Sequence, residues 1–475
     1  MKDNRLWQFV IAGIFGISVA AFLITVAMLG MLPTTYFAAI AAVIIVIGAL
    51  LLKGLLSKKK GKGKIVIAVI CCILSLACIA GTVVVSSMLS FFNQITAEDL
   101  KTGDYYVVVR DDSKYKALED IKGEVVSVLD VEDEMHAAAK ENLAEKVSVS
   151  FETAGNLQQA TDALMDGETE VLFMAVPYYD LTVEESKTFT KETTRILDTI
   201  RAEVKQKTEK KAKKLDVTKD AFNVYVSGID TEGSITNVSR SDVNMIMTIN
   251  PAERKILLTS IPRDYHVVLS SFGAYDKLTH SGIYGIDETT STVEDLLGIK
   301  IHHYVKVNFT TVRNLVDALG GIEVISEYDF TAGPGYHYNQ GSNYLNGDEA
   351  LYFARERYSF SSGDNQRVKN QQAVISGILN KATSSPAILT QYSSILAALE
   401  DNLAISLSQK EMSALVKMQL EDMRGWDIET ISLTGSGSYA ETYSMPGMDL
   451  YVMEPNHASI DAAKAAITGV MSGAE

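Results

Sequence analysis

Two kinds of charged side chain that could hold a phosphate group, directly or through a metal ion, recur in the second half of this sequence. Aspartate carboxylates are the hard oxygen ligands that suit Mg²⁺, and arginine guanidinium groups fit phosphate oxygens in pairs. The candidates are Asp230, Asp242, Arg240, Arg263, Arg355, Arg357 and Arg367, together with Gln371. In one place they would form a pyrophosphate clamp that stabilises charge during phosphoryl transfer. Taken singly, they could instead be surface ion pairs that contribute little.

Three short strands must position the first of these groups. The pattern of apolar and polar residues predicts strands over residues 222–229, 242–250 and 255–261. The connections between them are short, and sequential strands usually lie side by side, so we expect an antiparallel meander. One face of the second strand carries Met245, Met247 and Ile249.

An antiparallel meander brings one end of each strand to the same edge of the sheet. Asp230 follows the first strand, and Arg240 and Asp242 lie where the second begins. Arg263 and Asp264 follow the third. We therefore expect Asp230, Arg240, Asp242 and Arg263 to converge, where crowded charges need partners.

Helices are expected after the strands. Amphipathic patterns predict helices over residues 289–297 and 309–319, and Asp348 is placed to cap a third that runs through Phe353. Arg355 and Arg357 follow that helix. Residues two apart do not share a helix face, so the chain must be extended there for both to point one way.

A fourth helix is predicted from Asp364 to about Lys381. Asp364, Arg367 and Gln371 share one stripe of it. That polar stripe lies at the helix N-terminus, the end that favours an anion.

The N-terminal part of the chain has the pattern of a membrane anchor. Three uncharged runs cover residues 10–29, 36–52 and 65–89, and about 20 apolar residues suffice to cross a bilayer. We expect transmembrane helices over about 8–30, 35–56 and 65–90. A cleaved signal peptide is the alternative for the first run. Lysines and arginines precede the first run and fill the loop before the third, which predicts a cytoplasmic N-terminus and an extracellular chain after Ser90.

Charge divides the chain in the same way. Residues 1–94 carry seven Lys, one Arg and one Asp, a net +7, so the remainder of a chain of net charge −16 carries −23. An acidic exported part argues against nucleic-acid binding, which needs a basic face. The three cysteines, Cys71, Cys72 and Cys78, all lie in the third apolar run, so the exported part has no disulfide framework.

Residues 96–215 have the pattern of a small α/β accessory domain. Strands are predicted over 105–109, 124–129 and 170–175, and a helix over 132–143. No catalytic constellation is apparent there. The basic stretch 205–214 is interpreted as a charged helical connector, with contact to anionic wall polymer or lipid head groups as the alternative.

A series of short motifs runs in order along the second half of the chain. They are Gly228–Asp230, Arg240–Asp242, Ser260–Asp264, Asp276–His280, Asp317–Ile322, Leu345–Asp348, Arg355–Arg357, and Asp364 with Arg367 and Gln371. This set of motifs, in this order, resembles the LytR–CpsA–Psr family of cell-wall glycopolymer ligases. The resemblance covers about residues 220–425. The three spans and the domain before it resemble the CpsA-like branch.

The resemblance implies an α/β fold and an enzyme. We expect a membrane anchor at 1–94, an accessory domain at 96–215, an α/β/α catalytic domain with a central mixed sheet at 220–425, and a C-terminal strand and helix completing it at 426–475. Such an enzyme would transfer a phosphorylated glycopolymer, such as teichoic acid or capsule, from a polyprenyl-pyrophosphate carrier to peptidoglycan. A hydrophobic pocket in the core would take the prenyl tail.

The resemblance also implies residue roles. Asp230 and Asp242 would hold Mg²⁺, and Arg263, Asp264 and Asp364 would be catalytic. The pyrophosphate would be bound by Arg240, Arg263, Lys277, Arg355, Arg357, Arg367 and Gln371. The general base stays open between Asp264, Asp364 and a metal-bound or substrate oxygen.

Two departures from the family pattern lie near the clamp. Asn370 stands where the family commonly has arginine, and the usual Lys-x-Asn appears as Lys277–His280. Two other functions stay open: a non-catalytic sensor or scaffold that binds polyprenyl phosphate, and a transcription attenuator. Pyrophosphate hydrolysis is a conceivable side activity. The predicted topology speaks against direct DNA binding, because little of the chain would face the cytoplasm.

Overall fold

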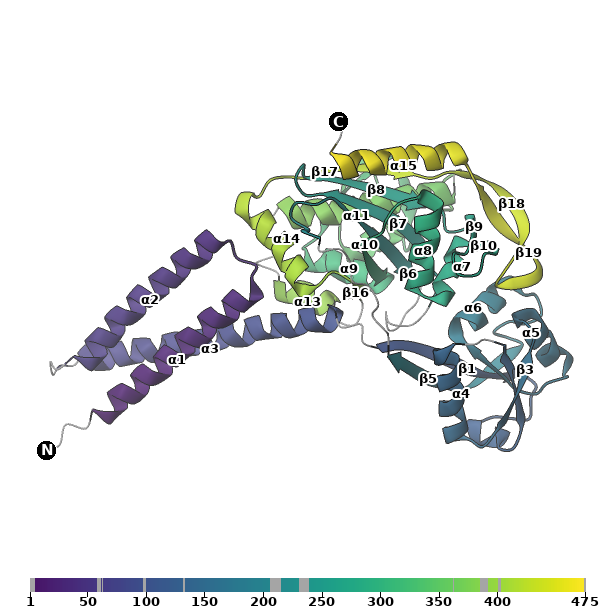
Figure 1. Ribbon diagram of the computed structural model, residues 1–475, viewed down its shortest axis with the longest axis horizontal. Helices are drawn as coiled ribbons and strands as arrows, with labels where there is room; N and C mark the ends of the chain where they lie inside the picture. The colour runs from purple at the N-terminus through teal and green to yellow at the C-terminus, as the bar shows by residue number, and fades with distance from the viewer. Residues whose placement is uncertain are drawn as a thin grey trace. The chain divides into compact units, whose positions relative to one another are not determined.

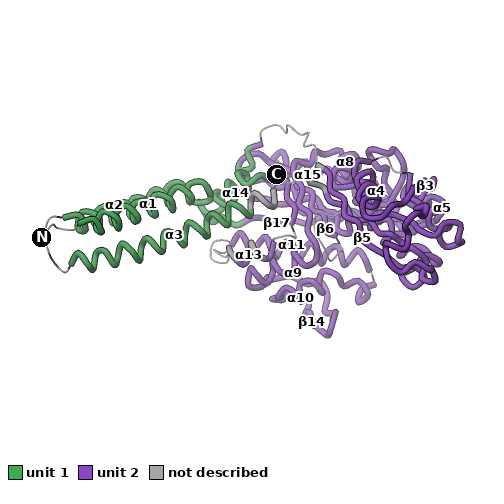
Figure 2. Tube along the Cα trace, turned by 90° about the horizontal axis from the view of Figure 1, so that it is seen from below, with its two compact units in different colours: residues 1–97, 216–218, 407–425 green, residues 98–215, 219–406, 426–475 purple. Residues whose placement is uncertain are grey.

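The chain divides into two compact units, which Figure 2 colours separately. The computed structural model describes residues 5–57, 61, 63–96, 100–130, 133–205, 215–229, 239–361, 363–384, 392–399 and 403–473. The first unit comprises residues 1–97, 216–218 and 407–425, and the second comprises residues 98–215, 219–406 and 426–475.

The first unit is built on three apolar helices, α1 (Leu6–Leu29), α2 (Thr34–Leu56) and α3 (Gly63–Thr96). Each is long and apolar enough to cross a membrane, in α3 over Gly63–Phe91. Gly30, with a φ of 69°, ends α1 in the left-handed conformation that glycine adopts without strain. The three predicted apolar helices are confirmed, and they indicate membrane anchoring.

Helix α14 (Gln409–Asp422) belongs to the same unit as the apolar helices. Its Lys417 Nζ donates a hydrogen bond to Thr34 Oγ1 at 3.0 Å. The sequence places residues 407–425 in the catalytic domain instead, because neither composition nor charge changes at that point. The difference arises from contacts between residues almost 400 positions apart, which leave no local pattern.

The second unit begins with a five-stranded sheet of order β3-β2-β4-β1-β5. Its strands are β1 (Leu100–Arg110), β2 (Val125–Leu129), β3 (Ser150–Ala154), β4 (Leu172–Ala175) and β5 (Thr194–Lys205). A short helix, η1 (Leu118–Ile121), and α4 (Glu134–Lys146) pack on one face; α5 (Leu157–Asp166) and α6 (Val176–Glu185) pack on the other.

The elements predicted in this part of the chain are confirmed within a few residues of their limits, whereas β3, β5, α5 and α6 are not predicted. Strand β5 extends to Lys205, so the prediction of a helical connector that starts at this residue is wrong there. The rest of the expected connector, residues 206–214, lies outside the described residues.

A six-stranded mixed sheet of order β16-β11-β6-β7-β8-β17 forms the centre of the unit (Figure 1). Its strands are β6 (Phe222–Ile229), β7 (Val243–Asn250), β8 (Lys255–Ile261), β11 (His303–Asn308), β16 (Leu403–Ile405) and β17 (Asp427–Ser432). β6, β7 and β8 pair antiparallel, whereas β11 and β17 run parallel to β6 and β8. The predicted meander and the mixed sheet are confirmed.

Helices cover both faces of this sheet. On one face, Ile246 and Leu257 pack against α8 (Ile286–Leu297) and α15 (His457–Ser472). On the other, Met245 and Leu258 pack against α11 (Asp364–Ser384). The alternation of β7 therefore orients its side chains as predicted, with Met247 and Ile249 beside Met245.

Shorter elements surround the sheet. The helices are α7 (Leu278–Ser281), η2 (Gly282–Tyr284), α9 (Phe309–Ala318), α10 (Gly347–Arg355) and α13 (Tyr392–Leu399). Four two-stranded ribbons pair β9 (His266–Val268) with β10 (Tyr275–Lys277), β12 (Ile322–Ser326) with β15 (Gly341–Leu345), β13 (Phe330–Ala332) with β14 (Tyr336–Tyr338), and β18 (Gly435–Thr442) with β19 (Met445–Pro455).

The N-terminal cap of α10 differs from the prediction. Asn346, not Asp348, caps this helix: its side chain accepts a hydrogen bond from the Glu349 backbone, and the Glu349 carboxylate accepts one from the Asn346 backbone. This reciprocal pair satisfies two helix donors, so the helix begins earlier than expected. Asp348 lies in the first turn, where its charge suits the helix dipole.

One hydrophobic cluster joins the accessory sheet and its helices to η2 and β19. Tyr179 and Leu181 of α6 pack in the same cluster as Ile283, Met445 and Leu450. The residues predicted as the accessory and catalytic domains thus lie in one compact unit, and α6 packs against η2 and β19.

We expect Gly377→Ala to destabilise the protein, although alanine is normally about 1 kcal/mol better than glycine inside a helix. A Cβ at Gly377 of α11 would lie 2.6 Å from the Glu323 carbonyl oxygen of β12. Such overpacking costs about 1–3 kcal/mol. The thermal unfolding midpoint of the full-length chain should fall for Gly377→Ala and stay level for Ser376→Ala. A raised midpoint for Gly377→Ala would contradict the packing of α11 on β12.

Candidate functional site

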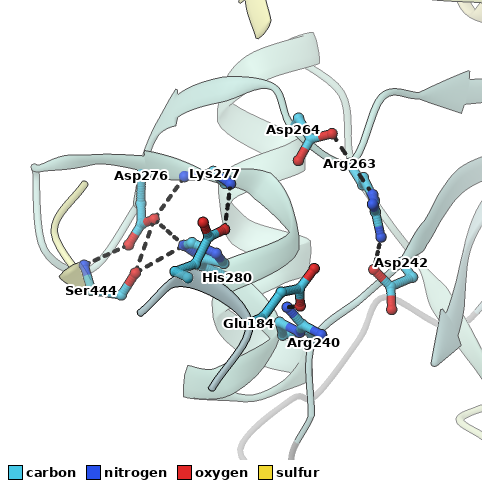
Figure 3. A network of polar contacts seen from close by, with 10 residues as sticks. Glu184, Arg240, Asp242, Arg263, Asp264, Asp276, Lys277, His280 and Ser444 are labelled. Carbon is cyan, nitrogen blue, oxygen red and sulfur yellow. Dashed lines mark hydrogen bonds and ion pairs between the residues drawn. The ribbon is translucent and has the colours of Figure 1, made fainter. Parts of the chain in front are cut away.

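One edge of the central sheet carries the pair of charges on which the site is built. Asp242 lies where β7 begins, and Arg263 lies two residues beyond β8. The Arg263 Nη1 donates a hydrogen bond to Asp242 Oδ1 at 2.7 Å, and its Nε lies 3.7 Å from Asp264 Oδ2 (Figure 3). The meander therefore brings these two predicted residues together. Asp230 lies outside the described residues.

The first turn of α11 adds a second arginine–aspartate pair. Arg367 Nη2 lies 2.6 Å from Asp364 Oδ1. Burial lowers the pKa of Arg367, and the neighbouring positive charge of Arg263 lowers it further. Burial alone would also lower the pKa of Arg263, but Asp242 and Asp264 outweigh burial, so that pKa is raised. Positive charge is thus concentrated here and held by carboxylates.

A small cavity of about 270 Å³ opens at this edge. Four cationic side chains line it, all among the predicted ones: Arg240, Arg263, Lys277 and Arg357. The acidic residues in its wall are Glu184, Glu185, Asp242, Asp264 and Asp364, and the other lining residues are Thr279, His280 and Tyr451.

Three of the residues predicted to bind the pyrophosphate, Arg355, Arg367 and Gln371, do not line this cavity. Arg355, the last residue of α10, places its guanidinium over the ring of Phe309 at 4.6 Å. Gln371 is half-buried on α11 and is not in the cavity wall. Glu356 is extended, but Arg355 still belongs to α10, so of the two arginines only Arg357 lines the cavity. The binding roles of all the predicted residues stay predictions.

The accessory part of the chain contributes two carboxylates that the sequence does not point to. Glu184 and Glu185 end α6; Glu184 pairs with Arg240, and Glu185 Oε1 lies 3.2 Å from Lys277 Nζ. Burial acts to raise the pKa of Glu184, but Arg240 and the other nearby cations lower it overall. Two glutamates at a helix end carry no signal in the sequence, because only tertiary packing brings them here.

A buried polar network holds the segment that carries Lys277. His280 Nδ1 lies 2.6 Å from Asp276 Oδ1 and 2.9 Å from the Ser444 hydroxyl (Figure 3). The Ser444 backbone N–H donates to Asp276 Oδ2 at 2.8 Å. His280, one of the departures from the family pattern, is therefore fixed by two partners. The network ties the β18–β19 turn to the wall of the cavity.

The site also contains donors that no described residue satisfies. Arg263 Nε, Arg367 Nε and the Thr279 hydroxyl are buried without a hydrogen-bond partner in the described part of the chain. Buried unpaired donors are costly. An anion with several oxygens would satisfy them, and charge-assisted bonds from guanidinium to phosphate are among the strongest.

The carboxylates of the small cavity fit a magnesium ion only if water and substrate phosphates supply most of its ligands. Among the described residues, no group of three or more His, Cys, Asp or Glu could hold a metal ion. Mg²⁺ commonly uses only one or two protein carboxylates and completes its shell with water and substrate phosphates. Asp242, beside the guanidinium groups, suits that arrangement.

Comparisons with known proteins give the family of this chain. A model of the LytR_cpsA_psr family matches residues 186–461. The match begins directly after Glu185, so most of the accessory sheet lies outside it. The chain is 33% identical over 222 residues to the polyisoprenyl-teichoic acid–peptidoglycan teichoic acid transferase TagU of Bacillus cereus (strain AH820), covering 46% of this chain and 71% of that protein.

A second related protein and a solved structure are also similar to this chain. The protein of the same name from Enterococcus faecalis (strain ATCC 700802 / V583) is 32% identical over 283 residues, covering 55% of this chain and 87% of that protein. The crystal structure of B. subtilis TagU is 29% identical, covers 53% of this chain and 97% of its own, and superposes with a TM-score of 0.42. The family model spans more than half of this chain, and the chain therefore belongs to the LytR_cpsA_psr family.

Proposed function

We propose that this protein transfers a phosphorylated glycopolymer from a polyprenyl-pyrophosphate carrier to peptidoglycan at the outer face of the cell membrane. The observation that carries the proposal is the cluster of four cationic side chains around the small cavity at the edge of the central sheet, among them Arg263, with unsatisfied guanidinium donors at Arg263 and Arg367. The teichoic acid transferases to which the chain is similar support the assignment of donor and acceptor.

The reaction is a phosphoryl transfer with a simple atom balance. A hydroxyl oxygen of peptidoglycan attacks the phosphorus attached to the glycopolymer, and a new P–O bond forms. The P–O bond of the diphosphate breaks, so that polyprenyl monophosphate leaves and the hydroxyl proton goes to a base. Negative charge spreads over the phosphoryl oxygens in such transition states, where fixed guanidinium groups stabilise it.

Asp264 is the carboxylate that we propose as the base. Burial raises its pKa, although Arg263 and Lys277 oppose the shift. A base works best when its pKa is near the working pH, so a raised carboxyl pKa suits the task. Asp364 pairs closely with Arg367 instead, which suits a role in orienting that guanidinium.

Mg²⁺ is part of the proposal. Asp242 would hold the ion together with Asp230, and the bound ion would supply positive charge to the diphosphate oxygens. We further propose that the N-terminus is cytoplasmic and that the second unit is extracellular, because lysines and arginines flank the apolar helices on one side.

Arg263→Ala should abolish most of the transfer. Loss of a preorganised charge at such a site costs about 10²–10³ in rate. Arg263→Lys should recover only part, because an ammonium lacks the planar fork. The assay mixes the full-length protein with a lipid-diphosphate glycan donor, peptidoglycan and Mg²⁺, and measures covalent attachment.

Arg313→Ala is the matched control, since Arg313 is a more exposed arginine outside the cavity. It should transfer like the unmodified protein. If the unmodified protein binds the donor but transfers it to no acceptor, a non-catalytic sensor replaces the enzyme.

The pH profile tests Asp264. Protonation disables a carboxylate base, and because this pKa is raised, the rate should fall at a higher pH than the ordinary aspartate value of about 3.9 implies. Asp264→Asn should be slow and should lack that acidic limb. An unchanged acidic limb in Asp264→Asn would assign the proton to another group.

Metal dependence is the third test. Chelation should stop transfer and added Mg²⁺ should restore it. Asp242→Asn should need a higher Mg²⁺ concentration for half-maximal rate, whereas Asp461→Asn, which removes an exposed charge from α15, should not. Full activity in the presence of a chelator would remove Mg²⁺ from the proposal.

A further inference from the structure

A second, much larger cavity adjoins the small one. It has a volume of about 1710 Å³, and its wall comes both from the accessory sheet with α6 and from the segments around β10, η2 and the β18–β19 turn. Glu184, Arg240 and Asp242 line both cavities. The two cavities therefore meet at these residues, so a ligand at this end of the large cavity lies beside the place where the small cavity would hold the diphosphate.

Carboxylates greatly outnumber cationic side chains in the wall of the large cavity. Among the described residues that line it, eight are acidic and three are basic. One of the basic residues, Arg201, already pairs with Asp104 at 2.9 Å, and another, Arg240, pairs with Glu184. A polyanion such as a phosphate-linked polymer would be repelled along most of this wall.

Aromatic rings form the rim that the catalytic part contributes. Phe272, Tyr275 and Tyr443 are between 41 and 58% exposed. Phe272 and Tyr443 stack with ring centroids 4.8 Å apart, and Tyr284 lies 4.6 Å from Phe272. Exposed rings next to carboxylates suit an uncharged sugar, whose C–H faces pack on rings while its hydroxyls donate hydrogen bonds to carboxylate oxygens.

The wall also contains buried polar groups without partners. His136 Nε2, the Ser239 hydroxyl and the Thr442 hydroxyl have no hydrogen-bond partner in the described chain. Each residue is at least nine-tenths buried and lines the cavity. They come from α4, from the segment before β7 and from β18. An unpaired buried polar group costs about 1–3 kcal/mol, which a ligand with several hydroxyls would relieve.

We propose that the large cavity binds an uncharged glycan strand, the acceptor of the transfer, and presents one of its hydroxyls at Arg240 and Asp242. The volume exceeds the roughly 300–1,000 Å³ of ordinary small-molecule pockets, as a run of several sugar units requires. The inference rests on the proposed function and adds a binding site to it. The accessory domain then supplies most of the acceptor site.

The test uses the full-length protein in lipid nanodiscs and two soluble probes. One is a hexamer of β-1,4-linked N-acetylglucosamine, and the other is polyglycerol phosphate of similar length. The double variant Phe272→Ala/Tyr443→Ala removes two rim rings. Tyr439→Ala is the matched control, since Tyr439 lies on the same ribbon, is 72% exposed and does not line the cavity.

The hexamer should bind the unmodified protein and Tyr439→Ala equally, and the double variant about tenfold more weakly, as expected for two lost ring contacts. Polyglycerol phosphate should not compete. The inference is overturned if the hexamer does not bind the unmodified protein, if the double variant binds it equally well, or if polyglycerol phosphate displaces it.

Transfer kinetics separate this inference from the proposed function. The double variant should raise the KM for the acceptor and leave the KM for the donor unchanged. If the unmodified protein binds the hexamer through these rings but transfers nothing, the glycan site stands and the ligase function fails. If the double variant transfers with an unchanged acceptor KM, the ligase function stands and the glycan site fails.

Discussion

The ion pair between Arg263 and Asp242 is the constraint on which the site depends. Arg263 is largely buried and lies close to the other cations of the small cavity, so it needs carboxylates on both sides. An isolated buried charge is strongly destabilising, and removing one partner of such a pair leaves the other uncompensated. The antiparallel register of β7 and β8 supplies this pairing, because it places the start of one strand beside the end of the other.

The same need for compensation explains why distant parts of the chain meet here. Asp364 comes from α11 and pairs with Arg367, whereas Glu184 comes from α6 and pairs with Arg240. Each carboxylate offsets a cation that would otherwise repel its neighbours. A diphosphate offers the guanidinium groups oxygens in a geometry that two separate carboxylates do not provide.

The sequence predicts the parts of the fold that have local patterns. The alternation over residues 222–261 suffices for β6, β7 and β8, and the meander then places Arg240 and Arg263 at one edge. The sequence does not predict Glu184 at this edge or the hydrogen bond between His280 and Ser444. Glu184 lies 56 positions from Arg240, and His280 lies 164 positions from Ser444, and contacts over such separations leave no periodic pattern. The cap at Asn346 could have been found, since a glutamate three residues later is the usual signal.

The contribution of β19 to the wall of the small cavity has a consequence for the order of events during synthesis. Tyr451 completes that wall, and β8 remains an edge strand until β17 pairs with it in parallel. A growing polypeptide can already hold its apolar helices in the bilayer, beside any lipid carrier present there, while this wall is incomplete. The small cavity can therefore be completed only after residue 451 has been synthesised and has left the ribosome.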